Sequence, residues 1–477
     1  MNGNSRQAAP HTHTPPPYHI FRVKDDCFLF DCSAYQFYQI DDLMHRILEL
    51  CLSMPLQSAR GVILAEGRYS PAEIERAMKE VDLVGCNGLF ERPANYLPLK
   101  DICAQIDAAV LDGQIVDIHA MLAESCNLAC KYCFGSTMLK NSSAGLMTEQ
   151  TAKKVIDILM EQEPQEVTIT LFGGEPLCNK PVIDFIMNYG REQAKLRGKT
   201  LQFSITTNAT LLDDKIIDHI VKNNFALMVS LDGPRDVHDR QCPTKSGGRS
   251  YDMAASNIKK LMQYRSVGGR ATMTHPMPNL KALIDFFEDF GFNIITIAPA
   301  QNRPGTETEA DFTPEDHDEL LRQQEELLPW MFERLITGDN PLYFPYSGIF
   351  SKIANGNIGK SGVMGCGGGT FVACADANGN LYQCAKLCGM ENWRIGHIDD
   401  GVDMDKNKLI WKKYWQCIQP FCGSCWAFPI CQGPCIWDCA KDDGSMSFYA
   451  GDCKYRKRNA EHAASLFCRC QNHADGE

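Results

Sequence analysis

Six apolar runs, separated by amphipathic stretches, occupy the middle of the chain from residue 115 to residue 300. The runs are rich in β-branched residues and are expected to form strands at residues 115–123, 166–172, 201–207, 226–232, 270–275 and 293–300. Helical periodicity is expected around residues 148–162, 181–197, 213–223, 252–264 and 280–290. Because strands that alternate with helices form parallel sheets, this pattern predicts an α/β fold with a partial (β/α)6 barrel of the TIM type.

Short polar motifs follow the first four runs. They read ESCNLACKYCF at residues 124–134, GGEP at 173–176, TNAT at 207–210 and DGP at 232–234. The carboxyl ends of parallel strands meet at one rim of a barrel, where such folds bind their ligands. The sequence therefore predicts one binding site that is built from all four motifs.

Three cysteines stand close together in the first motif. Cys126, Cys130 and Cys133 lie at spacings of four and three residues, and the next cysteine or histidine downstream is Cys178. Thiolates are soft ligands that favour zinc or iron-sulfur clusters. These residue types alone leave open an iron-sulfur cluster, a zinc site that a distant residue completes, or buried free thiols.

Cysteine is abundant in the rest of the chain as well. Of 23 cysteines, thirteen lie from Cys366 onward, and residues 1–17 lack the basic and apolar segments of an export signal. This combination predicts a cytoplasmic protein whose thiols serve metals or redox chemistry rather than disulfides. We expect residues 1–17 to be a flexible tail, in which His11 and His13 could bind a metal, and we expect metal rather than a hydrophobic core to organise the cysteine-rich end.

The charge balance and hydropathy exclude two classes of partner. The formal net charge is −12 and no basic run offsets it, which argues against a nucleic acid. No apolar run is long enough to cross a bilayer, which argues against a membrane. A polypeptide or a small molecule is the expected substrate.

The beginning of the chain is predicted to form a small separate α+β module. Residues 18–40 alternate apolar and polar side chains, which indicates short strands joined by turns at 24–26 and 31–34. Helices are expected after Asp41 or Asp42 and after Ser70. The predicted division of the chain is a tail at 1–17, this module at 18–110, the barrel at 111–336 and the cysteine-rich domain at 337–477.

The stretch CNLACKYC resembles the CxxxCxΦC signature of radical S-adenosylmethionine (SAM) enzymes, with Tyr132 as the aromatic residue. In that family the three thiolates hold three irons of a [4Fe-4S] cluster, and SAM chelates the fourth iron. The resemblance implies that Cys126, Cys130 and Cys133 bind this cluster and that the cosubstrate takes the place of the missing ligand. Reductive cleavage of SAM then yields a 5′-deoxyadenosyl radical.

The second motif resembles the GGEP loop of the same family. The resemblance implies that Gly173, Gly174 and Pro176 let the backbone approach the methionine part of SAM. It also implies that Glu175 accepts a hydrogen bond from the ammonium group of SAM.

The next two motifs resemble SAM contacts further along the barrel. TNAT is similar to the family's TNGT element, with Ala209 in place of the usual glycine, which implies that Asn208 lies near the ribose. SLDGP with the following HDR resembles SxDGP…HDxxR, spaced slightly differently at its end. The resemblance implies that Ser230 touches the ribose and that Arg240 touches the SAM carboxylate, although Arg240 could equally form a surface ion pair.

The cysteine-rich end resembles the seven-cysteine SPASM arrangement, which holds two auxiliary [4Fe-4S] clusters in related enzymes. The resemblance assigns the first auxiliary cluster to Cys366, Cys384 and Cys435, with Cys374 as the best candidate for an eighth ligand. The second auxiliary cluster is assigned to Cys422, Cys425, Cys431 and Cys453. A zinc ribbon would also explain the CxxC spacing, but not its presence beside the SAM motifs.

As a whole, the resemblance implies an enzyme that modifies a ribosomally made peptide or protein. It is greatest to thioether-forming maturases, including those of quinohemoprotein amine dehydrogenase. In the mechanism that this implies, the radical removes hydrogen from the methylene group of an acidic residue, a peptide thiolate bonds to that carbon, and an auxiliary cluster accepts the surplus electron. Asp232 and His275, at strand ends, are candidate bases, although either could be structural.

Two other functions remain open at this stage. One is formylglycine formation of the kind performed by anaerobic sulfatase maturases, and the other is a non-catalytic iron-sulfur electron carrier. The expected partners are a precursor peptide or small protein subunit as substrate, and a flavodoxin- or ferredoxin-type reductant. The first module resembles the leader-recognition elements of peptide maturases, which take up a substrate segment as an added strand.

Overall fold

The computed structural model describes residues 16–91, 99–133, 135, 145–301, 303, 305–339, 341–360, 363–448 and 453–476. All of the predicted tail except residues 16 and 17 lies outside these ranges, including His11 and His13.

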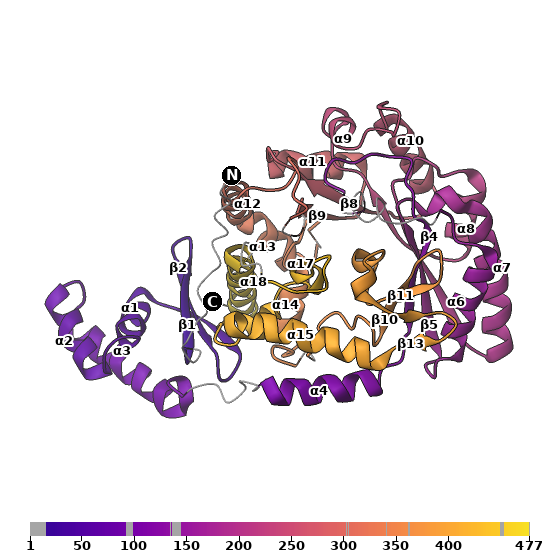
Figure 1. The fold of residues 1–477 in the computed structure, drawn as a ribbon. Helices are drawn as coiled ribbons and strands as arrows, with labels where there is room; N and C mark the ends of the chain where they lie inside the picture. The colour runs from indigo at the N-terminus through magenta and orange to yellow at the C-terminus, as the bar shows by residue number, and fades with distance from the viewer. Residues whose placement is uncertain are drawn as a thin grey trace, which may run out of the picture.

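Six parallel strands form the centre of the molecule and confirm the predicted α/β barrel. Their order in the sheet follows the chain, from β4 (Asp117–Ala123) through β5 (Glu166–Gly173), β6 (Thr200–Thr207), β7 (Ala226–Ser230) and β8 (Gly268–Met273) to β9 (Ile294–Pro299). The intervening helices are α6 (Glu149–Glu161), α7 (Lys180–Arg197), α8 (Asp214–Lys222), α9 (Arg235–Gln241), α10 (Tyr251–Met262) and α11 (Leu280–Phe290), with a 3-10 turn at Pro176–Asn179. Figure 1 shows α7 and α8 on the outside of the curved sheet.

The strands are apolar because parallel sheets are covered on both faces. Ile118, Ile169 and Ile205 each have at most 1% of their surface exposed. The helices that cover the sheet bury one face only, as α8 does with Ile216, Ile217 and Ile220. This difference explains why continuous apolar runs marked the strands and helical periodicity marked the helices.

The cysteine-rich end continues the barrel sheet. β10 (Val372–Ala375) pairs in parallel with β4, and β11 (Asn380–Tyr382), β12 (Arg394–His397) and β13 (Gly401–Val402) follow in antiparallel order. Two long helices, α15 (Met404–Cys422) and α18 (Cys453–Asp475), pack in this region. The shorter elements are α12 (Pro314–Glu326), α13 (Leu328–Ile336), α14 (Ser347–Ala354), α16 (Phe428–Cys431), α17 (Ile436–Cys439) and 3-10 turns at Ala385–Leu387 and Glu391–Trp393.

This region has an extensive apolar core, so the prediction that metal rather than a core would organise it was wrong in that respect. Trp393, Trp411 and Ile418 are buried within the same core as the barrel. The parallel pairing of β10 with β4 joins the two regions through one sheet, and a sequence pattern of four residues is too short to reveal it.

The N-terminal module contains β1 (Tyr18–Val23), β2 (Asp26–Asp31) and β3 (Gln36–Ile40), which form an antiparallel sheet in chain order, followed by α1 (Asp42–Cys51), α2 (Leu56–Glu66), α3 (Pro71–Val84) and a π-helical turn at Gly85–Leu89. The predicted strands and helix starts are confirmed, since Asp41 caps α1 and Ser70 forms a capping box on α3.

The module is docked on the rest of the chain rather than separate from it. One face of its sheet, with Phe28 and Phe30, belongs to the main core, and the other face, with Tyr18 and Leu29, packs on α1–α3. The final helix of the predicted module, α4 (Leu99–Leu111), packs against α15, and the predicted boundary at residue 110 stays a prediction. Figure 1 shows α1–α3 at the end of the molecule opposite α7.

Candidate functional site at the carboxyl ends of the strands

A two-stranded ribbon holds the three-cysteine loop in place. The Ala129 N–H donates to the Pro243 carbonyl at 2.8 Å, and the Lys131 N–H donates to the Gln241 carbonyl at 2.9 Å. Leu128 forms an antiparallel bridge with Thr244. Residues 127–131 therefore run antiparallel to residues 241–245, which follow α9, and the sequence offered no signal for this pairing.

The GGEP loop presses directly on the three-cysteine loop. Its amide groups reach back to the first loop, where Gly174 N–H donates to the Ala123 carbonyl at 2.8 Å and Glu175 N–H donates to the Ser125 carbonyl at 3.1 Å. A Cβ atom on Gly173 would lie 2.5 Å from the Ala123 oxygen, and one on Gly174 would lie 2.6 Å from the Ser125 oxygen. Both positions therefore require glycine, because the backbones of the two loops approach each other too closely for a side chain.

Glu175 joins the ends of two strands. Its carboxylate accepts hydrogen bonds from the Thr207 hydroxyl at 2.7 Å, the Asn208 N–H at 2.8 Å and the Leu177 N–H at 3.0 Å. Burial raises the pKa of Glu175 to about 7, although these hydrogen bonds act in the opposite direction. The carboxylate thus anchors the TNAT turn to the GGEP loop, and its contact with the SAM ammonium stays a prediction.

Asn208 connects the TNAT turn to the cysteine loop. Its side-chain amide donates to the Asn127 side chain at 2.9 Å and lies 3.8 Å from the Cys126 sulfur. Ala209, at the position where the resembled motif has glycine, adopts a left-handed conformation with φ of 61°. The left-handed conformation costs a non-glycine residue roughly 1–2 kcal/mol. The turn therefore keeps the backbone shape that glycine would adopt, and Ala209 bears this cost.

Asp232 and Tyr132 form a buried network behind the cysteine loop. The Tyr132 hydroxyl donates to Asp232 Oδ2 at 2.8 Å, the Cys242 thiol lies 3.2 Å from the same oxygen, and the Thr272 N–H donates to Asp232 Oδ1 at 2.9 Å. Asp232 is only 2% exposed, and burial raises its pKa. The Asp232 carboxylate is thus buried and holds the Tyr132 hydroxyl, and its role as a base stays a prediction.

His275 lies on the rim just beyond β8. Its side chain is 46% exposed, and Nδ1 lies 2.8 Å from Asp316 Oδ2. Burial by itself raises the pKa of Asp316. Hydrogen bonds from Thr313 and His275 together have a larger, opposite effect, so the pKa of Asp316 is lowered overall. Among the other predicted SAM contacts, Ser230 is half-buried at the end of β7, Arg240 is exposed, and Pro176 is buried.

The four cysteines assigned to the second auxiliary cluster surround one cavity. Cys422, Cys425, Cys431 and Cys453 all line it, and burial together with the three neighbouring thiols raises the pKa of Cys422. Arg456 and Lys457 line the same cavity. Four thiols around one space fit an iron-sulfur cluster, and Lys457 can offset part of the negative charge that such a cluster carries, whereas Arg456 pairs with Asp438, which lines the same cavity.

The three cysteines assigned to the first auxiliary cluster also lie near one another. Burial, with the neighbouring Cys435 and Cys366 thiols, raises the pKa of Cys384 to about 12. Cys374 is fully buried in β10, where burial and a hydrogen bond with Cys388 raise its pKa. The set of Cys366, Cys384 and Cys435 thus fits a shared cluster, and the role of Cys374 as an eighth ligand stays a prediction.

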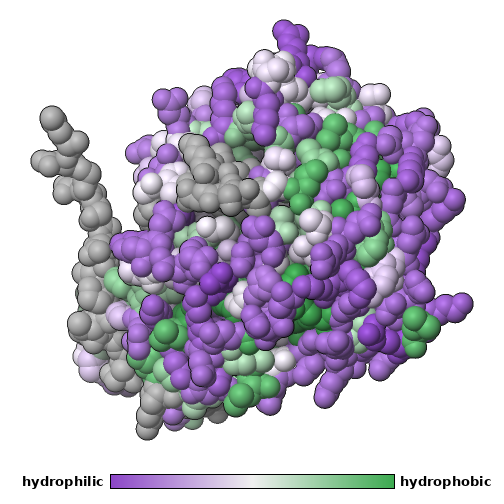
Figure 2. Space-filling model, turned by 45° about the vertical axis from the view of Figure 1, so that its right-hand side comes forward, coloured by the Kyte–Doolittle hydropathy of each residue, from purple (hydrophilic) through white to green (hydrophobic). Residues whose placement is uncertain are grey.

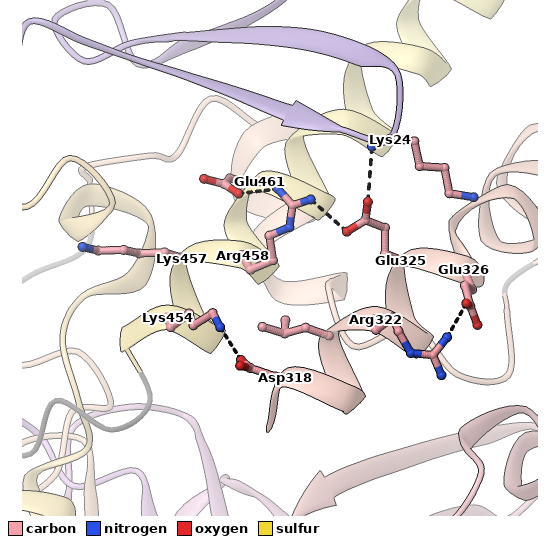
Figure 3. A pocket seen from close by; sticks show the side chains of 10 residues that line it. Lys24, Asp318, Arg322, Glu325, Glu326, Lys454, Lys457, Arg458 and Glu461 are labelled. Carbon is pink, nitrogen blue, oxygen red and sulfur yellow. Dashed lines mark hydrogen bonds and ion pairs between the residues drawn. The ribbon is translucent and has the colours of Figure 1, made fainter. Parts of the chain in front are cut away.

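A charged pocket of about 630 Å³ lies between the β1–β2 turn, α12 and α18 (Figure 3). Ion pairs neutralise much of its lining, including Lys454 with Asp318 and Arg458 with Glu325. Of the described residues, none forms an ion pair with the ammonium group of Lys24 or Lys457. The pocket therefore has an excess of positive charge close to Cys453, the first residue of α18.

Hydrophilic side chains predominate on the face shown in Figure 2, with small hydrophobic groups between them. Within the described ranges, no helix is both long enough and apolar enough to span a bilayer.

Comparisons with known proteins agree with this architecture. Residues 122–290 match the family described as the Radical SAM superfamily. The cysteine-type anaerobic sulfatase-maturating enzyme of Clostridium perfringens is 22% identical over 330 residues, which cover 66% of this chain and 86% of that enzyme.

Two solved structures share the fold. The structure of native anSMEcpe with bound AdoMet and the Cp18Cys peptide has a TM-score of 0.61 at 19% identity, and covers 76% of this chain and 100% of that chain. Streptococcus suis SuiB bound to the precursor peptide SuiA has a TM-score of 0.50 at 15% identity, and covers 91% of this chain and 97% of that chain.

The contact between the two loops predicts that Gly174→Ala displaces the three-cysteine loop, because the new Cβ meets backbone atoms that cannot rotate away. After anaerobic reconstitution, the variant is expected to lose the iron of one cluster while keeping its fold. Gly61→Ala is the matched control, since a Cβ there meets nothing within 4 Å. Equal iron content per chain in the two variants would contradict the assignment of the three-cysteine loop as the binding site of a cluster.

The raised pKa of Glu175 predicts a pH dependence. Between its ordinary pKa of 4.5 and about 7, the folded chain binds more protons than the unfolded chain, so Glu175 lowers the free energy of unfolding as the pH rises. Glu175→Gln removes this effect, and its stability relative to the parent is expected to increase by up to about 3 kcal/mol from about pH 5 to about pH 8. In the variant the glutamine NH2 group faces the Asn208 N–H, which loses its hydrogen-bond acceptor. The loss of this hydrogen bond lowers the stability by the same amount at every pH. Denaturant unfolding at several pH values measures the difference in the free energy of unfolding between variant and parent. A difference that does not change with pH would contradict the raised pKa of Glu175.

Proposed function

Because this chain is an enzyme of the radical SAM superfamily, we propose that it modifies a ribosomally made peptide or protein by joining a cysteine sulfur to a carbon atom of the same peptide. The observation that carries the proposal is the meeting of the three-cysteine loop with the GGEP and TNAT loops, combined with two further cysteine sets in the C-terminal region. The proposed carbon is the methylene group of an aspartate or glutamate.

The chemistry requires acceptors for three products. Joining a thiol sulfur to a carbon releases one hydrogen atom, one proton and one electron. When bound, SAM at the [4Fe-4S] cluster supplies the acceptor for the hydrogen atom, and auxiliary [4Fe-4S] clusters can take the electron. The proton needs a base from this chain or from the solvent.

The chain's own residues bind and orient these groups. We assign the SAM-binding cluster to Cys126, Cys130 and Cys133, with the glycine amides of the GGEP loop against the methionine part of SAM. Asn208, Ser230 and Arg240 are proposed to contact the ribose and the carboxylate. The support for this assignment is that Asn208 lies beside Cys126, and that Ser230 stands at the same strand rim.

His275 is the proposed base. With its Nδ1 atom hydrogen-bonded to Asp316, Nε2 is left as the atom that can accept a proton. Its exposure on the rim supports access to a peptide thiol, in contrast to the buried Asp232.

Two surfaces support the proposed partners. β3 pairs only with β2 among the described strands, so a substrate segment can add to its free edge. The excess positive charge of the pocket near Cys453 suits an acidic electron carrier of the flavodoxin or ferredoxin type.

Formylglycine formation is the second candidate function, favoured by the similarity to the anaerobic sulfatase-maturating enzyme. The two products differ chemically. Thioether formation removes two hydrogen atoms and keeps every sulfur, whereas conversion of cysteine to formylglycine replaces sulfur by oxygen.

Coexpression with a small cysteine-rich peptide encoded beside this gene tests the proposal by mass spectrometry. We expect the peptide to lose two hydrogen atoms per cross-link and to resist thiol alkylation. Loss of sulfur from the peptide would replace the thioether assignment by formylglycine formation. Absence of 5′-deoxyadenosine with SAM and a strong reductant would favour a non-catalytic electron carrier.

The role of His275 predicts that His275→Ala slows peptide modification by roughly a hundredfold, while SAM cleavage continues. The matched control is His219→Ala, because His219 also pairs with a carboxylate, that of Asp184, but lies in the last turn of α8. This turn lies at the amino ends of the strands, away from the rim. Equal rates of product formation in the two variants would exclude His275 as the base.

A further inference from the structure

Cys242 is a buried thiol that directly faces a cysteine of the three-cysteine loop. In the ribbon described above, the pairs Ala129–Pro243 and Lys131–Gln241 are joined by backbone hydrogen bonds. Cys130 and Cys242 lie between these two hydrogen-bonded pairs and are directly opposite each other. They form a non-hydrogen-bonded pair, the type in which the side chains of antiparallel strands come closest. The bridge between Leu128 and Thr244 confirms this register.

The other side of the Cys242 thiol is enclosed by a fixed polar group. In the structure the thiol donates to Asp232 Oδ2 at 3.2 Å, and its sulfur lies 3.3 Å from the Tyr132 hydroxyl. Asp232 already accepts hydrogen bonds from Tyr132 and from the Thr272 N–H. The carboxylate therefore keeps its hydrogen-bond partners if the Cys242 proton turns toward Cys130.

We propose that Cys242 donates an S–H hydrogen bond to the sulfur of Cys130 when this residue is an iron ligand, and that it thereby makes the SAM-binding cluster easier to reduce. A thiolate ligand is a strong acceptor, and hydrogen bonds to ligand sulfurs stabilise the more negatively charged, reduced state of a cluster. The effect is large at this site because Cys242 is only 3% exposed, and little water competes with the bond.

Counted from His238, the HDxxR pattern places its arginine at position 242, where this sequence has cysteine. The inference rests on the SAM-binding cluster of the proposed function, but not on the identity of the peptide.

The test is the reduction potential of the SAM-binding cluster in the full-length holoenzyme, measured by EPR-monitored titration. The signal that changes on addition of SAM identifies this cluster among the three proposed. Cys242→Ala and Cys242→Val remove the donor, and both are expected to shift the potential to a more negative value. Cys242→Ser retains an O–H donor and is expected to restore a potential close to that of the parent.

Valine fills the space that alanine leaves empty, so the pair separates loss of the donor from loss of packing. Cys468→Ala, a buried thiol in α18, is the control and is expected to leave the potential unchanged. An unchanged potential in the valine variant, or equal shifts in the serine and valine variants, would overturn the inference alone. A parent enzyme without any SAM-sensitive signal would overturn the proposed function as well.

Discussion

Backbone hydrogen bonds fix the position of the three-cysteine loop, and the rest of the site depends on them. On one side the loop pairs with residues 241–245, and on the other it receives the amides of Gly174 and Glu175. Because backbone groups carry these contacts, the loop is held in place while its cysteine side chains remain available as ligands. The glycines of the second loop are required at this contact, since any side chain would push the two loops apart.

The same rim is tied together by buried polar groups. Glu175 connects the GGEP loop to the TNAT turn, and Asp232 connects Tyr132 to β8 through Thr272. Neither carboxylate has a cation beside it in these contacts, and burial raises the pKa of each. Their hydrogen-bond donors stabilise the buried carboxylates instead, so both acidic residues help to hold the loops of the rim together.

The three parts of the chain form one assembly. The pairing of β10 with β4 extends the barrel sheet into the cysteine-rich region, and α18 packs against β1 and β3 of the N-terminal module. His19 of β1 stacks on Trp426, next to Cys425, at a ring distance of 3.7 Å. β1 of the N-terminal sheet therefore contacts the loop that carries the second auxiliary cysteine set.

The sequence by itself determined the six strands, the helices between them and the motifs at their carboxyl ends, because periodicity and spacing are local properties of the chain. The resemblance to the SPASM arrangement also grouped Cys422, Cys425, Cys431 and Cys453, and in the structure these four residues line one cavity. Only the tertiary structure decided that Cys242 faces Cys130, that Asp232 points inward and His275 outward, and that the first module is docked. These outcomes depend on burial and on contacts between residues far apart in the chain, such as the pairs 41 and 100 positions apart that His275 and Tyr132 form, which no local pattern records.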